Sequence, residues 1–132
     1  MENRIKISSG SPYEKPVGYS RAVRIGNIIA ISGTAPIHPD GSNAFPGDLY
    51  RQTIKCLEII FTAVRDAGGK PENIYRTRVY LTDASSWKEA GKAHGEAFSD
   101  IRPACTFVEV KGLLDKEWLV EIEADCWIQN AI

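Results

Sequence analysis

The 132-residue sequence lacks any apolar run long enough to cross a membrane. A transmembrane helix needs about 20 such residues in succession. The opening segment MENRIKISSG carries charges where a signal peptide would place its apolar region, so secretion is not expected either. We predict a cytoplasmic protein with no membrane partner.

Cysteine and histidine are too few and too widely spaced to indicate a metal site. Cys56, Cys105 and Cys126 form no CxxC motif, which predicts neither a disulfide framework nor a zinc site. His38 and His94 have no spacing to carboxylates that would aim two donors at one metal. We therefore expect no metal ion.

The sequence also lacks an excess of charge of one sign, because 16 basic residues accompany 17 acidic ones. Affinity for nucleic-acid backbones comes mostly from positive charge, so nucleic-acid binding is unexpected. What the chain does have is 43% apolar residues, enough to form a core without disulfide or metal links. We predict one domain over residues 1–132.

Secondary-structure signals alternate along the chain. Ser9–Gly18 predicts a loop, two apolar runs around Gly26-Asn27 predict a β-hairpin, and residues 36–47 predict an irregular excursion. Asp48 predicts the start of a helix that stops at Gly68-Gly69.

A second helix is predicted to end before Pro103, with Ser86 and Glu89 at capping-box spacing. Its apolar stripe consists of Trp87, Ala90, Ala93, His94, Ala97 and Phe98. Further strands are predicted over residues 75–82, 104–110 and 118–128.

This order predicts an α+β fold in which two helices pack on one face of a single mixed β-sheet. The segments IIAIS and CTFV are nevertheless apolar on both faces of their strands. Burying the second face requires a partner, so we expect self-association through the bare face of the sheet.

Three carboxylates alternate along the last predicted strand and therefore share one face. Glu121, Glu123 and Asp125 would lie about 7 Å apart in succession. Like charges at this spacing raise one another's pKa when desolvated, which suits general acid or base chemistry. The alternative is a polar face that is wetted by solvent or paired with Arg76 and Arg78.

Other residues admit both a chemical and a structural interpretation. Cys105 and His94 could form a thiol–imidazole pair, or be a core cysteine and a hydrogen-bonded histidine. Gly33 could let backbone amides approach a ligand, or mark a turn or bulge. Tyr19 and Ser20 could present hydroxyl groups at a cleft, or simply begin a surface strand.

One combination of motifs spans residues 19–125, and it consists of GYSRAVRIGN, the SG after IIAI, the excursion with HPDG, RPACTFVEV and VEIEA. In this combination the sequence resembles the RidA (YjgF) family of reactive-intermediate deaminases. The resemblance implies a chorismate-mutase-like fold and a homotrimer with helices outside and clefts between subunits. Enzymatic members hydrolyse 2-imino acids or their enamine tautomers to 2-oxo acids and ammonia, without metal or organic cofactor.

The resemblance implies that part of the family's site is retained. The tyrosine corresponds to Tyr19, the glycine whose backbone N–H faces the ligand to Gly33, and the glutamate that holds the attacking water to Glu121. The arginine whose planar fork clamps the substrate carboxylate is replaced by Cys105. A frequent cysteine is replaced by Phe107, and the asparagine of the second helix by Gly91.

Other arginines could replace the missing guanidinium. Arg102 is an odd number of residues from Cys105, and Pro103 favours an extended backbone before it, so Arg102 is expected to point to the opposite face. Arg76 or Arg78 could instead reach the cleft from a neighbouring strand or subunit.

The sequence therefore predicts a trimer that binds a small metabolite between subunits and that hydrolyses an imine or related bond with water held by Glu121. A non-catalytic binding or regulatory trimer is the alternative, favoured by the changes at Cys105, Phe107 and Gly91. Some relatives carry an endoribonuclease label. Two histidines in dissimilar settings and no basic stripe give that activity little support.

Overall fold

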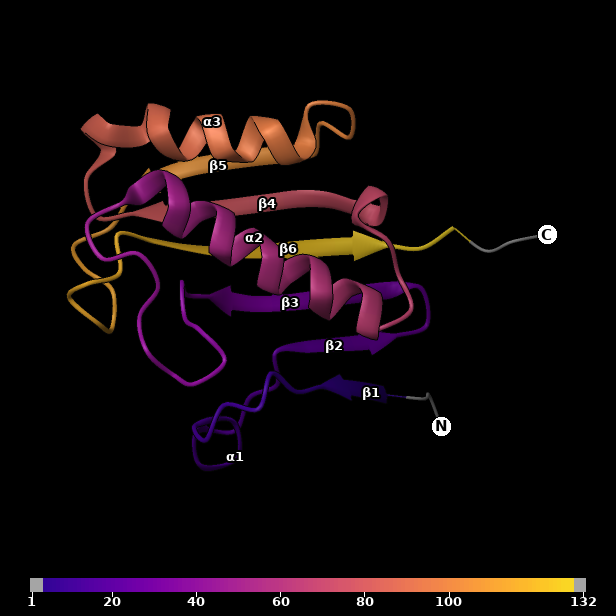
Figure 1. The fold of residues 1–132 in the computed structure, drawn as a ribbon. Coiled ribbons are helices and arrows are strands. Elements are labelled where there is room, and N and C mark those ends of the chain that lie inside the picture. Colours follow the sequence, from indigo (N-terminus) through magenta and orange to yellow (C-terminus); the bar gives the residue numbers. More distant parts are fainter. Residues whose placement is uncertain (1–3, 130–132) are drawn as a thin grey trace.

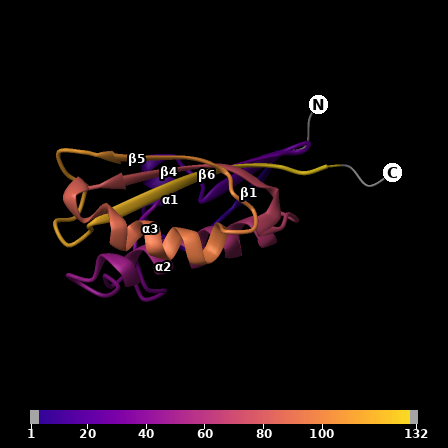
Figure 2. The same ribbon diagram turned by 90° about the horizontal axis from the view of Figure 1, so that it is seen from above.

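The computed structural model describes residues 4–129 as a six-stranded mixed sheet with two long helices on one face (Figures 1 and 2). The strand order is β1-β2-β3-β6-β4-β5. The strands are β1 (Arg4–Ile7), β2 (Ala22–Ile25), β3 (Ile28–Thr34), β4 (Ile74–Leu81), β5 (Ala104–Glu109) and β6 (Val120–Trp127). The α-helices are α1 (Glu14–Val17), α2 (Leu49–Asp66) and α3 (Trp87–Phe98), and 3₁₀ turns lie at Pro71–Asn73 and Ala84–Ser86. The predicted α+β class is confirmed.

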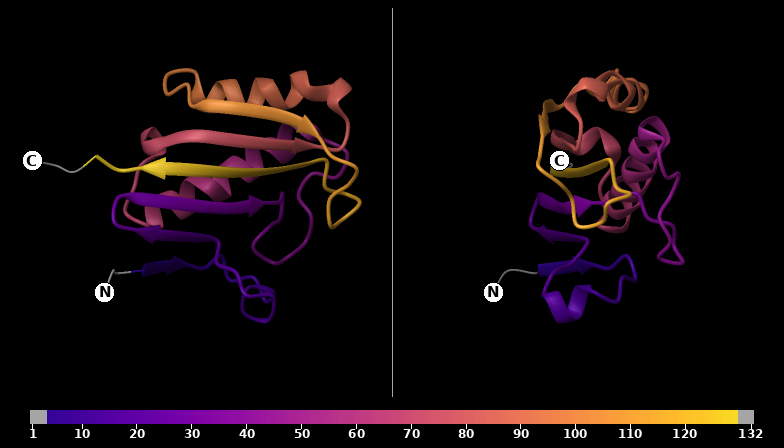
Figure 3. Two further views of the ribbon diagram at one scale, coloured as in Figure 1. Left: turned by 180° about the vertical axis from the view of Figure 1, so that it is seen from behind. Right: turned by 90° about the vertical axis from the view of Figure 1, so that its left-hand side faces the viewer.

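Two crossovers place both long helices on the same side. Strands β4 and β5 are parallel, and all other neighbouring strands are antiparallel. Since β3 and β4 both pair with β6, they run in the same direction, and α2 connects them while α3 connects β4 to β5. Successive crossovers of one hand that move the same way along a sheet put their helices on one face. Figure 3 shows the other face without a helix over its central strands.

Helix α2 forms as the sequence predicts. The Asp48 side chain accepts a hydrogen bond from the backbone N–H of Arg51 at 3.0 Å, and the chain leaves the helix at Gly68, whose φ is +89°. The residues that α2 buries against the sheet include Cys56, Leu57, Ile60 and Val64. Opposite them lie the buried residues of β6, which are Val120, Ile122, Ala124 and Cys126.

The prediction for the start of α3 was wrong in two respects. Ser86 makes no capping hydrogen bond, because it already ends a 3₁₀ turn in which Asp83 accepts from the N–H of Ser85. Trp87 is 48% exposed and so does not belong to the buried stripe, although Ala90, Ala93, His94 and Phe98 do.

The structure differs from the sequence predictions in two further places, the N-terminal segment and Arg102. The N-terminal residues add an edge strand, β1, and the predicted loop Ser9–Gly18 contains the single turn of α1. Arg102 is not extended, since its φ is +54° and its N–H donates to the carbonyl of Phe98 at the end of α3. The prediction that an extended backbone turns Arg102 away from Cys105 was therefore wrong in its premise.

The helix-free face carries exposed apolar residues in the segments that were predicted to be buried on both sides. Ile28 on β3 is 56% exposed and Val108 on β5 is 42% exposed. Single apolar side chains are common on protein surfaces, but these belong to strands whose other face is already covered. Association of copies through this face stays a prediction.

Replacing the buried Gln52 with leucine is expected to lower the free energy of unfolding by about 2 kcal/mol. The Gln52 amide donates to the carbonyls of Phe45 and Glu117 and accepts from the N–H of Leu119, which ties the excursion and the start of β6 to α2. Leucine would leave these backbone groups without their partner. Denaturant unfolding measures the change, and Glu58→Gln, at an exposed position of the same helix, should shift stability by less than about 0.5 kcal/mol.

Candidate functional site

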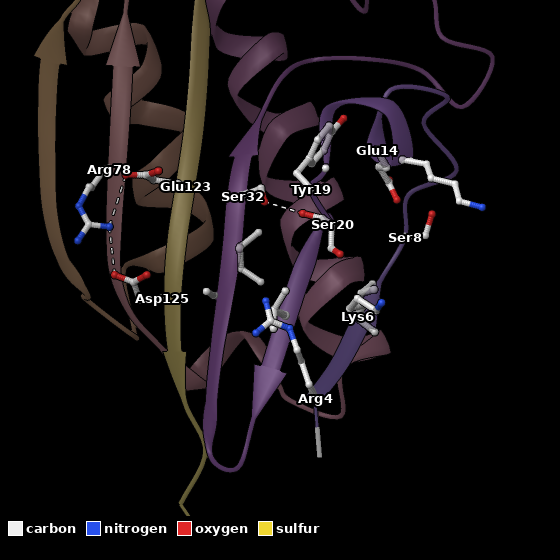
Figure 4. Close-up of a pocket in the computed structure, with 16 residues that line it drawn as sticks. Arg4, Lys6, Ser8, Glu14, Tyr19, Ser20, Ser32, Arg78, Glu123 and Asp125 are labelled. Carbon is white, nitrogen blue, oxygen red and sulfur yellow. Dashed lines mark hydrogen bonds and ion pairs between the residues drawn. The ribbon is translucent and has the colours of Figure 1, made fainter. Parts of the chain in front are cut away.

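Of the three carboxylates on β6, the two beyond Glu121 have partners. Arg78 lies 3.1 Å from Asp125 and 3.5 Å from Glu123 (Figure 4). The hydroxyl of Tyr80 donates to Glu123 at 2.6 Å. The structural interpretation of a paired polar face therefore holds for these two residues.

Glu121 differs from its two neighbours. Within residues 4–129 it makes no side-chain hydrogen bond or ion pair, and no buried side-chain oxygen there lacks a partner. Its oxygens must therefore reach solvent, although the residue is partly buried. A carboxylate with free lone pairs at the surface can hold a water molecule or a ligand donor.

The Glu121 side chain packs against Gly33 where the pairing between β3 and β6 changes register. The pairing of β3 with β6 shifts between Ile31 and Thr34, which is a β-bulge, and Gly33 lies inside it. A Cβ atom on residue 33 would overlap the Oε2 atom of Glu121. Gly33 is thus a bulge residue, which was one of its two predicted roles. Its missing side chain also lets the Glu121 carboxylate approach the backbone.

Arg21 and Tyr19 surround the same bulge. The Nη1 atom of Arg21 donates to the carbonyl of Gly33 at 2.7 Å, and its guanidinium carbon lies 5.7 Å from the centre of the Tyr19 ring. The Tyr19 hydroxyl is 3.3 Å from the Ser11 hydroxyl. The structure therefore brings Tyr19, Gly33 and Glu121 together around Arg21, a residue that the sequence analysis missed.

The surroundings of Glu121 favour its protonated form. Burial raises the pKa of this carboxyl, the charge of Arg21 lowers it and the charge of Glu123 raises it, with a net rise. A raised pKa brings a carboxyl closer to the range in which it can both accept and return a proton near neutral pH.

A second group of predicted residues lies on the other side of the sheet. Cys105 on β5 lies beside Thr77, which is buried beneath α3, whereas Glu121 lies opposite Tyr80 on the helix-free face. Strand β4 separates β5 from β6. Within one chain, Cys105 and Glu121 are therefore two strands apart and on opposite faces.

Aromatic side chains form the surface around Cys105. The Trp87 and Phe107 rings meet edge to face at 6.1 Å, and Phe107 also meets His94 at 5.7 Å. Trp87 also covers Gly91, where an added Cβ would lie 3.2 Å from the indole. The sequence analysis had placed Trp87 in the buried stripe of the helix and so missed it as a residue of this surface. The sequence feature that indicates this position of Trp87 is Gly91, one helical turn later, because a glycine there leaves room for the indole ring.

The thiol–imidazole interpretation loses support because Thr77 lies between the two groups. The Nε2 atom of His94 is 2.8 Å from the Thr77 hydroxyl, and Thr77 is also the register partner of Cys105 across β4 and β5. Burial raises the pKa of Cys105 and lowers the pKa of His94, so both groups are held in their neutral forms. His94 is the hydrogen-bonded core histidine of the structural alternative.

The helix-free face also holds a broad open concavity of about 860 Å³ (Figure 4). Its lining includes Tyr19, Ser20 and Ser32 beside the bulge, and charged side chains of β1, β4 and β6. Within residues 4–129 no cluster of histidine, cysteine and carboxylate side chains could hold a metal ion. None of the helices in this range is long and apolar enough to span a bilayer.

Replacing Glu121 with glutamine should stabilise the free protein at neutral pH. A carboxyl with a raised folded pKa stabilises the fold below its unfolded pKa, and this contribution is lost as the pH rises through the folded pKa. Above that pH the variant should be more stable by about 0.5 kcal/mol, a small value because solvent screens a half-exposed charge. Denaturant unfolding from about pH 8 to about pH 4 should show the difference shrinking as the pH falls. A constant difference would contradict the assignment.

Comparisons with known proteins identify the family of this chain. The family model Endoribonuclease L-PSP matches residues 12–128. RutC family protein PH0854 of Pyrococcus horikoshii is 36% identical over 111 residues, which cover 83% of this chain and 87% of the relative.

Solved structures show the same fold. The crystal structure of Rv2704 from Mycobacterium tuberculosis, a member of the YjgF/YER057c/UK114 family, has 42% identity and a TM-score of 0.88, and the match covers 96% of this chain and 100% of that one. RidA from the Antarctic bacterium Psychrobacter sp. PAMC 21119 has 30% identity and a TM-score of 0.74, with coverage of 84% and 89%.

Proposed function

This chain belongs to the YjgF/RidA family, and from that membership we propose that it binds a small metabolite in clefts between copies of itself and hydrolyses an imine or enamine there. The observation that carries the proposal is the Glu121 carboxylate. It is the one member of the β6 row without a partner in residues 4–129, it is partly desolvated, and it rests on Gly33 at the helix-free face.

In the proposed reaction Glu121 acts as a general base and then returns the proton. It accepts a proton from a bound water molecule as the water oxygen bonds to the imine carbon. Glu121 passes this proton to the nitrogen, which gives a carbinolamine. It then carries the proton of the new hydroxyl group to the same nitrogen as the carbon–nitrogen bond breaks, so ammonia leaves and the carbon becomes a carbonyl. No electrons are transferred, so the reaction needs no oxidant. The Tyr19 hydroxyl and the Gly33 backbone would orient the substrate.

A second copy of the chain would complete the cleft. Tyr19, Gly33 and Glu121 lie on one face, whereas Cys105, Phe107 and Gly91 lie around an edge strand and α3. No single copy can direct both groups at one small ligand. Strand β5 is one of the two edge strands of the sheet, and Val108 and Ile28 provide apolar surface for association. We propose a homotrimer, the assembly that the family resemblance implies.

The β5 side of the cleft favours a substrate without a carboxylate. Cys105 stands where the family resemblance places a guanidinium, its raised pKa keeps the thiol neutral, and Phe107 and Trp87 supply aromatic surface. Loss of a bidentate charged contact typically costs about 2 to 5 kcal/mol of binding. The preferred substrate is therefore an imine with an uncharged, apolar substituent rather than a 2-imino acid.

The same changes support a second candidate function, in which the trimer binds a small ligand for regulation and performs no turnover. The observation in its favour is that Cys105, Phe107 and Gly91 all depart from the catalytic pattern. RNA cleavage is not favoured, because the concavity on this face mixes basic side chains of β1 and β4 with the acidic side chains of β6 and so presents no basic stripe to phosphate.

Two imine sources distinguish these functions. An amine oxidase converts primary amines to imines without a carboxylate, and an amino-acid oxidase supplies 2-imino acids. We expect the protein to accelerate ammonia release mainly from the first source, and Glu121→Gln to reduce this acceleration about 100-fold. Glu89→Gln, at an exposed position on α3, is the matched control and should leave it unchanged. No acceleration from either source, together with thermal stabilisation by small carbonyl compounds, would overturn hydrolysis in favour of the binding function.

A further inference from the structure

Arg21 is a buried arginine whose guanidinium donates hydrogen bonds to three residues at the end of strand β3. The residue is 9% exposed, and its Nη1 atom donates to the Gly33 carbonyl at 2.7 Å, to the Thr34 hydroxyl at 2.8 Å and to the Ser32 carbonyl at 3.4 Å. Ser32 and Gly33 form the bulge of β3, and Thr34 resumes the pairing with β6. A bulge lacks regular ladder pairing, so a side chain that binds its carbonyl groups fixes its conformation.

The bulge in turn determines where the Glu121 carboxylate can lie. Gly33 is in contact with Oε2 of Glu121, and the Arg21 guanidinium holds the carbonyl of that same glycine. A movement of the bulge would therefore move the surface on which the carboxylate rests. Arg21 therefore acts on Glu121 in two ways. It holds the backbone of Gly33, on which the carboxylate rests, and its positive charge lowers the pKa of the Glu121 carboxyl.

The other charged and titratable groups around Glu121 do not supply a positive charge. Glu123 is the next residue on this face of β6, Tyr80 lies opposite on β4, and the Cys56 thiol lies beneath the sheet on α2. Arg78 on β4 is held by Glu123 and Asp125. Of the groups whose charge acts on the Glu121 carboxyl, Arg21 is the positive one.

We propose that Arg21 is a positioning residue of the candidate site: its guanidinium fixes the bulge at Ser32 and Gly33 on which the Glu121 carboxylate rests. The role of this pair in hydrolysis rests on the function proposed above. The coupling of the two side chains does not, because it exists in the free protein.

Carbon-detected NMR titration of the Glu121 carboxyl in the free protein tests the proposal. Arg21→Gln removes the charge but keeps an amide donor, so the titration midpoint of Glu121 should move to higher pH. Arg21→Lys keeps the charge but lacks the planar fork, so the midpoint should move less while the amide resonances of Ser32, Gly33 and Thr34 shift. Arg24→Gln is the matched control, because Arg24 lies on β2 only three residues after Arg21 but donates to the carbonyls of Gly26 and Ala67.

The result that overturns the proposal is a Glu121 midpoint that is the same in Arg21→Gln, Arg24→Gln and the native protein. If Arg21→Gln does not fold, the same question can be tested in the native protein. The chemical shift of the Arg21 side-chain Nε–H should titrate with the same midpoint as the Glu121 carboxyl. A shift that does not change over this titration refutes the coupling. Catalytic failure with an intact coupling would reject the proposed function and leave this inference standing.

Discussion

Replacing Cys105 with arginine is expected to raise kcat/KM for 2-imino acids by a factor of tens to thousands. A guanidinium at this position would give the substrate carboxylate two parallel charged hydrogen bonds, an interaction whose loss costs about 2 to 5 kcal/mol. Cys105 is exposed on an edge strand, so the longer side chain has room. The measurement is the rate of ammonia release from imines that an amino-acid oxidase produces.

The control for this gain is Cys105→Lys, which adds the same charge without the planar fork and should recover much less activity. A triple variant that also carries Phe107→Cys and Gly91→Asn tests whether the aromatic surface obstructs the substrate. An added side chain at position 91 would displace Trp87, which the Gly91 backbone now supports. If both arginine variants fold and associate normally but show no gain with 2-imino acids, the assignment of position 105 to the cleft is wrong.

Replacing Gly33 with alanine is expected to reduce hydrolysis about 100-fold while the fold persists. The added Cβ would overlap Oε2 of Glu121. That atom is the free end of a flexible side chain, so the carboxylate can turn away and the backbone need not move. Displacement of a catalytic group by about 1 Å can cost a hundredfold in rate, although the free energy of unfolding should change by less than about 1 kcal/mol.

Gly95→Ala is the matched control for this prediction. Gly95 lies in α3, where a methyl group added to its Cα would have no neighbouring atom within 4 Å, and alanine is the better helix former. This variant should keep full activity and gain up to about 1 kcal/mol of stability. An active Gly33→Ala protein would show that the contact between Gly33 and Glu121 has no part in the reaction.

The fold was largely predictable because its signals are local. The alternation of β6, the apolar stripe and cap of α2 and the Gly26-Asn27 hairpin each depend on residues close in sequence. The capping box at Ser86 failed because a preceding 3₁₀ turn had already begun the helix. Strand β1 was missed because it is only four residues long, is mostly exposed and pairs with a neighbouring strand along one side only.

The candidate site was predictable only in part. Family resemblance pointed to Tyr19, Gly33 and Glu121, and the structure places these residues around one bulge. Periodicity put three carboxylates on one face, but it could not tell that Arg78 and Tyr80 engage two of them and leave Glu121 free. Arg21 carries no signal in the sequence beyond its charge, because its role depends on long-range contacts with residues 32–34.

A site shared between copies of the chain requires the chain to associate in solution, and sedimentation velocity measures this association. We expect one species with three times the 14.6 kDa mass of the chain at the concentrations used for activity assays. A single 14.6 kDa species at those concentrations would contradict it, because Cys105 and Glu121 lie on opposite faces of one sheet and could not then meet at one ligand.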